Sequence, residues 1–216
     1  MSNSARRAAM VESQLMVNDV TGPPLLQAMG EIPRELFVPP AMEAVAYMDV
    51  PVPLPGGRVL LDARCFGKLV QLAAIGSQDK VLDVGCGTGY STAVIARLAA
   101  HVTGLEEDAE LAKAAAKNLA TLGIPNAEIM RGPLKDGQPA RAPFDVILIN
   151  GAVEIAPAQL LEQLAERGRL VCVRRAGTAG QGTIYVRSDG AFGERTEFGA
   201  QLPVLPGFQK AAGFVF

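Results

Sequence analysis

The chain has 216 residues, of which 49% are hydrophobic and 19% charged, and its net charge is −2. This length and composition are typical of a globular protein with a sizeable core and exclude a disordered chain. Without a basic cluster or an apolar run of membrane-spanning length, we expect neither a nucleic-acid nor a membrane partner.

The N-terminal residues and the cysteines indicate the cellular compartment. Met1–Arg7 is polar and differs from a signal peptide. The three cysteines, Cys65, Cys86 and Cys172, are scattered and odd in number, which favours a reducing cytoplasm over a disulfide framework. With one histidine and no close cysteine pair, we expect no metal site.

The N-terminal quarter is rich in helix signals and prolines. Residues 8–18 show an imperfect helical stripe, and residues 25–29 predict a second short helix. The stretch up to Gly56-Gly57 contains too many prolines for a central strand. We therefore expect residues 1–60 to form a cap of helices and loops, and residues 61–74 to form a helix.

The central stretch runs from Lys80 to Tyr90. Residues 80–84 are an apolar run typical of a buried parallel strand, and Gly85, Gly87 and Gly89 follow at alternate positions. A helix is predicted over 91–98, so the stretch is strand, glycine turn and helix, as in nucleotide-binding folds. Tyr90 stands where a dinucleotide site needs a small residue, which favours a nucleoside without a pyrophosphate, such as S-adenosylmethionine.

The next predicted strand, residues 102–106, ends in a carboxylate. Glu106 lies 21 residues after Gly85, where an acid can accept hydrogen bonds from ribose hydroxyls. Glu107 is the adjacent, solvated charge. The pattern then predicts a helix over 108–122 ended by Gly123, strands over 127–131, 144–150 and 168–173, a helix over 157–166, and C-terminal strands that include 182–187 and 212–216.

These elements predict a doubly wound α/β sheet, mostly parallel, with an antiparallel C-terminal edge. We expect one domain over 1–216, with a cap at 1–60, a cofactor-binding core at 61–175 and C-terminal strands at 176–216.

Other candidate site residues lie close to the glycines. Asp83, Cys86 and Thr88 belong to the loop itself, and we interpret Cys86 as a small filler, not as a nucleophile. Asn150 follows a strand end, where open α/β sheets bind ligands. It could reach the ligand or the acceptor, or it could cap the next turn.

Several blocks resemble the protein-L-isoaspartate O-methyltransferase family. They are Met10-Val11 with Gln14-Leu15, Ile32–Pro39, Ala46-Tyr47 with Asp49, Val81–Tyr90, Pro143–Asp145, and Gln163-Leu164 with Gly168–Val171. The resemblance implies a Rossmann-like, cytoplasmic repair enzyme that moves a methyl group from S-adenosylmethionine to the α-carboxyl of isoaspartyl residues in proteins. We expect a monomer or a weak dimer.

The chain departs from the family pattern at three places. Val59 and Leu61 match acceptor-site positions at which the family has hydroxyls, and backbone amides or the nearby Arg58 and Arg64 could take the place of those hydroxyls. Gly132-Pro133 stands where the family tends to have Gly-Asp near the adenine. The segment Leu205–Phe208 is not the family ending. Three functions therefore stay open: isoaspartyl repair, methylation of another acceptor by the same fold, and binding of S-adenosylmethionine without catalysis.

Overall fold

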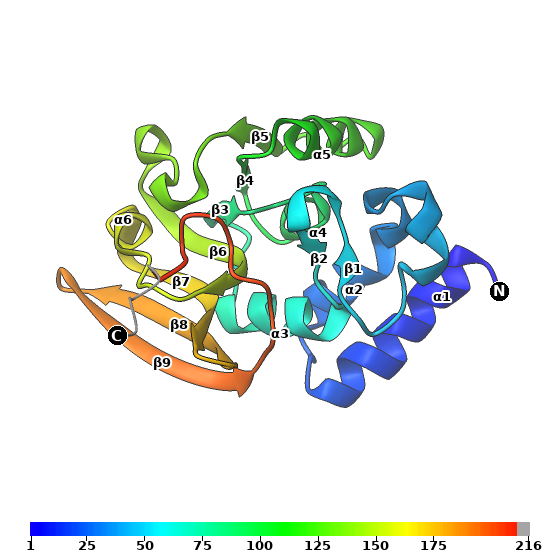
Figure 1. Ribbon diagram of the computed structural model, residues 1–216, viewed down its shortest axis with the longest axis horizontal. Helices are drawn as coiled ribbons and strands as arrows, with labels where there is room; N and C mark the ends of the chain where they lie inside the picture. Colours follow the sequence, from blue (N-terminus) through cyan, green and yellow to red (C-terminus); the bar gives the residue numbers. More distant parts are fainter. Residues whose placement is uncertain (211–216) are drawn as a thin grey trace, which may run out of the picture.

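The computed structural model describes residues 1–210 and is built around one seven-stranded sheet (Figure 1). The strand order is β5-β4-β3-β6-β7-β8-β9; β3 to β7 run parallel, and β8 and β9 add antiparallel pairs. The predicted fold class is confirmed. The strands are β3 (Lys80–Val84), β4 (His101–Glu106), β5 (Ala127–Arg131), β6 (Phe144–Val153), β7 (Leu164–Ala176), β8 (Ala179–Ser188) and β9 (Ala191–Gly199).

Helices and a small hairpin surround this sheet. The α-helices are α1 (Asn3–Met10), α2 (Pro23–Glu31), α3 (Ala63–Ala73), α4 (Tyr90–Ile95), α5 (Ala109–Thr121) and α6 (Ala158–Leu161). Strands β1 (Val52–Pro53) and β2 (Val59–Leu60) pair with each other only. In Figure 1, α1 and α2 lie at one end of the molecule and the β8–β9 hairpin at the other. Within residues 1–210, no helix combines the length and apolar character needed to cross a lipid bilayer.

The buried strands are apolar on both faces, as parallel strands between two layers must be. Val81 and Val146 belong to one hydrophobic core, which they share with α3, α4, α5 and the N-terminal helices. Their neighbours Leu82 and Ile147 belong to a second core, shared with α6 and the segment around Leu205. The alternation follows from the two-residue period of a strand.

Two predicted elements differ from the structure. The helix expected over 157–166 is wrong beyond Leu161, because Leu164 already pairs with Phe144 at the start of β7. The backbone N–H of Phe144 donates to the carbonyl of Gln163, so sheet pairing replaces the next helical turn. The C-terminal strands end at Gly199, and residues 200–210 contribute one isolated bridge; the strand expected at 212–216 lies outside the described residues.

The turn between β3 and α4 depends on a close approach to α5. Gly89 has φ +93°, and a Cβ there would lie 3.1 Å from Cα of Ala115. Gly123, just past the end of α5, has φ +60° and open space around the Cβ position. At both glycines the backbone conformation would strain any other residue. Only at Gly89 would an added Cβ also crowd a neighbouring atom.

We predict that Gly89→Ala lowers the free energy of unfolding by about 2–3 kcal/mol, because it adds a backbone contact to the cost of a positive φ. Gly123→Ala is the matched control and should lose only about 1 kcal/mol. Urea denaturation of both variants measures the difference. Equal losses would show that α5 can give way at Ala115.

Candidate functional site

The candidate site lies at the carboxyl ends of β3, β4 and β6. The strand order reverses at β3, because β4 and β6 flank it on opposite sides. Open α/β sheets bind ligands at such a switch point, outside the carboxyl ends of the strands. The glycine turn leaves the end of β3 here, and the last residues of β4 and β6 meet it.

The glycine turn has a backbone that other residues rarely adopt. Gly85, Gly87 and Gly89 have φ of +75°, +57° and +93°. The amide of Gly85 donates to the carbonyl of Leu105 at 2.8 Å, which ties the turn to the end of β4. A Cβ on Gly85 would lie 2.7 Å from Nη2 of Arg58, so the side of the turn that faces the ligand end of the sheet is closely covered.

Glu106 is fully buried and organises this edge. Its Oε2 accepts from the amide of Gly87 at 2.8 Å, and its Oε1 accepts from the amides of Glu107 at 3.0 Å and Asp108 at 3.2 Å. Nη1 of Arg58 donates to Oε1 at 2.7 Å, and both side chains of this ion pair are buried. The predicted ribose acceptor is thus a core residue with a charged partner of its own.

A second buried carboxylate lies behind the turn. Asp83 accepts from the hydroxyls of Ser91 at 2.7 Å and Thr92 at 2.6 Å, and Asn150 donates its side-chain amide to the other oxygen. Burial raises the pKa of the Asp83 carboxyl to about 6, although these three hydrogen bonds oppose the rise. Asn150 therefore holds Asp83, an arrangement different from a cap on the following turn.

Thr88 and Tyr90 connect the turn to the N-terminal segment. The Thr88 hydroxyl donates to the carbonyl of Phe37 at 2.6 Å. The Tyr90 ring is buried between Phe37 and Phe66, with centroids 5.5 and 5.6 Å away. The guanidinium of Arg34 lies 5.1 Å from the Tyr90 ring centre. These contacts hold the segment around Arg34 against the glycine turn.

Cys86 is buried inside the turn. Burial raises the pKa of its thiol well above the usual range, and the nearby carboxylates of Asp83 and Glu106 add to the rise. A thiolate is therefore disfavoured, which supports the interpretation of Cys86 as a filler.

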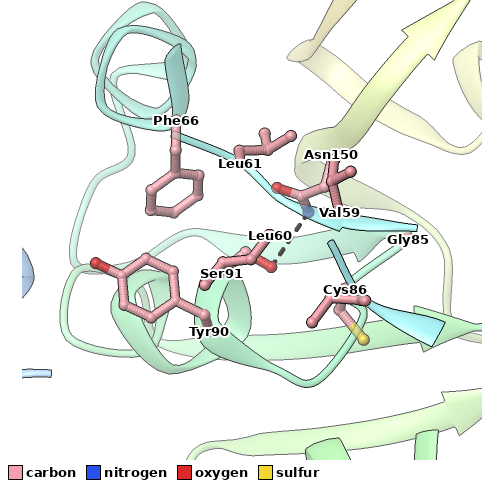
Figure 2. Close-up of a pocket in the computed structure, with 10 residues that line it drawn as sticks. Val59, Leu60, Leu61, Phe66, Gly85, Cys86, Tyr90, Ser91 and Asn150 are labelled. Carbon is pink, nitrogen blue, oxygen red and sulfur yellow. Dashed lines mark hydrogen bonds between the residues drawn. The ribbon is translucent and has the colours of Figure 1, made fainter. Parts of the chain in front are cut away.

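Val59 and Leu61 lie beside the turn and line a small cavity together with Ser91 and Asn150 (Figure 2). The dashed line in Figure 2 marks the 3.2 Å hydrogen bond from Asn150 to Ser91. The cavity holds about 20 Å³, room for about one water molecule. The structure thus brings the two predicted acceptor positions next to the loop residues Gly85, Cys86 and Tyr90.

The remaining predicted residues gather at a different hollow. Glu107, Gly132 and Pro133 line an open depression together with Arg131, at the ends of β4 and β5. The amide of Gly132 donates to the backbone carbonyl of Glu106 at 3.2 Å, which fixes this hollow beside the carboxylate.

The sequence assigned no site role to Leu205, and it placed Arg58 near the acceptor positions without indicating its pairing with Glu106. The segment 203–208 runs along the end of β6: the amide of Ala152 donates to Pro203 at 2.9 Å, and that of Leu205 donates to Ala152 at 3.0 Å. A Cβ on Gly151 would lie 2.5 Å from Leu205 Cγ. The local signals were the Gly56-Gly57 turn before Arg58 and the departure at residues 205–208, but neither reveals a long-range partner.

Comparison with known proteins identifies relatives over nearly the whole chain. A family model described as protein-L-isoaspartate(D-aspartate) O-methyltransferase matches residues 5–191. A protein-L-isoaspartate O-methyltransferase of Methanoregula boonei is 37% identical over 188 residues, which cover 87% of this chain and 86% of the relative. A second relative, from Pelobacter propionicus, is 36% identical over 192 residues and covers 89% and 85%.

A solved structure has the same fold. The Plasmodium falciparum protein, described as a protein-L-isoaspartate O-methyltransferase in complex with S-adenosyl-L-homocysteine, gives a TM-score of 0.79 at 19% identity. The match covers 92% of this chain and 97% of that chain.

The raised pKa of Asp83 predicts a pH dependence of stability. The folded state binds a proton that the unfolded state releases near pH 4, so this residue lowers the stability as the pH rises from about 4 to about 6. Asp83→Asn removes the titration, and the Ser91 and Thr92 hydroxyls can reorient toward the amide. Between pH 4 and pH 7, its free energy of unfolding should gain about 3 kcal/mol relative to the parent. If the free energies of unfolding of the two proteins, measured by urea denaturation, change with pH in parallel, the raised pKa of Asp83 is contradicted.

Proposed function

Because the chain belongs to the protein-L-isoaspartate(D-aspartate) O-methyltransferase family, we propose that it methylates the free carboxyl of isoaspartyl residues in damaged proteins with S-adenosylmethionine. The observation that carries this proposal is the buried Glu106 carboxylate beside the glycine turn, at the switch point of the sheet. A charged acceptor at the end of the second strand suits a ribose diol.

The residues fit S-adenosylmethionine by their chemistry. Gly85, Gly87 and Gly89 leave the backbone of the turn without a Cβ, Glu106 offers carboxylate oxygens for the ribose, and the hollow at Glu107, Gly132 and Pro133 lies beside it for the adenine. The cofactor supplies a methyl group on a positively charged sulfur. The buried carboxylates of Asp83 and Glu106 favour a cationic ligand at this edge.

The reaction asks little acid–base chemistry of the protein. A carboxylate oxygen of the acceptor forms a bond to the methyl carbon, the bond from that carbon to sulfur breaks, and the electron pair stays on sulfur. No proton moves, so alignment and exclusion of water carry the rate. The side chains of Val59, Leu61 and Phe66 form an apolar wall of the cavity beside Gly85.

A second candidate, a methyltransferase with another acceptor, is favoured by the same wall. The side chains of Val59 and Leu61 cannot donate hydrogen bonds to an acceptor carboxylate. A buried carboxylate that lacks donors pays a desolvation cost, which predicts weak turnover on isoaspartyl substrates.

Further proposals concern the domain organisation, the cellular compartment and the partners. We propose that the chain acts as one methyltransferase domain, with residues 1–60 as a cap, 61–175 as the cofactor-binding core and 176–216 as a C-terminal segment that carries β8 and β9; the Thr88–Phe37 hydrogen bond supports packing of the cap on the core. We also propose a repair role in the cytoplasm, as a monomer or weak dimer that takes protein or peptide substrates and no nucleic acid. The buried free thiols of Cys65, Cys86 and Cys172 support a reducing compartment.

Labelled methyl transfer tests the proposal. With tritiated S-adenosylmethionine, the chain should esterify an isoaspartyl peptide and leave the same peptide with normal aspartate unlabelled. Val59→Thr with Leu61→Ser should raise the turnover about 30-fold, since two hydroxyl donors each stabilise a carboxylate by about 1 kcal/mol. Label on lysate proteins with none on the isoaspartyl peptide would support the second candidate instead. Equal turnover of the parent and the double variant on the isoaspartyl peptide would contradict the explanation from the apolar wall.

A further inference from the structure

The carboxylate of Glu106 has one crowded oxygen and one that still has room for a hydrogen bond. Its Oε1 accepts from three donors, Nη1 of Arg58 and the amides of Glu107 and Asp108, at 2.7 to 3.2 Å, and its Oε2 accepts from the amide of Gly87 at 2.8 Å. A carboxylate offers about four lone-pair positions. One position on Oε2 remains, so a ribose diol can place both hydroxyls on Glu106 only if a donor leaves Oε1.

Arg58 is the donor that can leave. The three amides belong to the glycine turn and to the start of α5, where Asp108 caps the helix by accepting from Glu110 and Leu111 at 2.9 Å. Arg58 directly follows a tight turn, and its long side chain reaches Glu106 from there. That turn contains Gly56 and Gly57 at φ +68° and +71°, both exposed.

The guanidinium also covers the glycine turn. Its Nη2 donates to the carbonyl of Gly85 at 2.9 Å. Leu205 Cδ1 would lie 3.0 Å from a Cβ on the same glycine, so two side chains from distant segments lie over this turn. The cavity beside Gly85 holds about 20 Å³ and a neighbouring hollow lined by Arg58, Asn150 and Leu205 about 200 Å³, and both are below the roughly 300 Å³ at which ligand pockets begin.

We propose that Arg58 is a positioning residue that exchanges partners during the reaction, an inference that rests on the proposed function. The ribose of S-adenosylmethionine takes its place at Glu106, and the released guanidinium pairs with the carboxylate of the methyl acceptor. A buried arginine that loses its anion needs a new one, because an unpaired buried charge is strongly destabilising.

The acceptor carboxylate is the partner at hand. Arg58 directly precedes Val59, and Val59 and Leu61 line the cavity beside Gly85. Their side chains donate nothing, whereas the guanidinium offers the planar pair of N–H groups that matches a carboxylate. The exchange also imposes an order: the cofactor binds first, and only then is the cation free for the acceptor.

Calorimetry with S-adenosylhomocysteine tests the exchange on the full chain. Arg58→Gln removes the competitor at Glu106, so it should bind S-adenosylhomocysteine at least about 10-fold more tightly than the parent. Arg58→Lys keeps a cation and should stay within about 3-fold of the parent. Arg169→Gln is the matched control: Arg169 pairs with Asp79 at the same 2.7 Å, but at the opposite end of β3, and its loss should not tighten binding.

Kinetics on an isoaspartyl peptide at saturating cofactor supply the second readout. Arg58→Gln should raise KM for the peptide about 10-fold with kcat nearly unchanged, and Arg58→Lys should recover part of that loss. Unchanged or weaker binding of S-adenosylhomocysteine by Arg58→Gln, in a chain whose parent binds it, would overturn the exchange and leave the proposed function standing. If neither the parent nor any variant binds it, both proposals fail.

Discussion

The buried carboxylate of Glu106 is the interaction on which the ligand end of this molecule depends. It joins the glycine turn through the amide of Gly87, the first turn of α5 through Asp108, and the hairpin before α3 through Arg58. A lone buried carboxylate would be costly, so the three elements that donate to it must stay together. The geometry that stabilises the edge is also the geometry that would receive a ribose, because both need donors aimed at the same two oxygens.

The sheet was largely predictable because its strands are short apolar runs between turn signals. Residues 127–131 match β5 to the residue, and the apolar run that opens the stretch from Lys80 to Tyr90 is β3, which ends just before the first glycine. The helix expected over 157–166 failed because Leu160, Leu161 and Leu164 suit a helical face as well as a strand end. Pairing with Phe144, 20 residues away in sequence, decided between them, and no local pattern reports such a partner.

The site was predictable where its chemistry is local and unpredictable where it depends on distant segments. The glycines and Glu106 lie next to the strands that carry them, so their meeting follows from parallel strand order. Arg58 lies 48 positions before Glu106, and Leu205 lies 54 positions after Gly151. Both reach the turn through tertiary packing alone. The burial of Glu106 could not be predicted from the sequence either, because a strand end can be exposed or covered by other segments.

Calorimetry that compares S-adenosylhomocysteine with its 2′,3′-dideoxy analogue measures the contact between Glu106 and the ribose most directly. Loss of both hydroxyls removes two hydrogen bonds to a charged acceptor and should weaken binding at least about 10-fold in the parent. In Glu106→Gln the penalty should shrink, since the amide offers one neutral acceptor. Equal affinity of the parent for the two ligands would contradict the account, because Glu106 would then serve the fold alone.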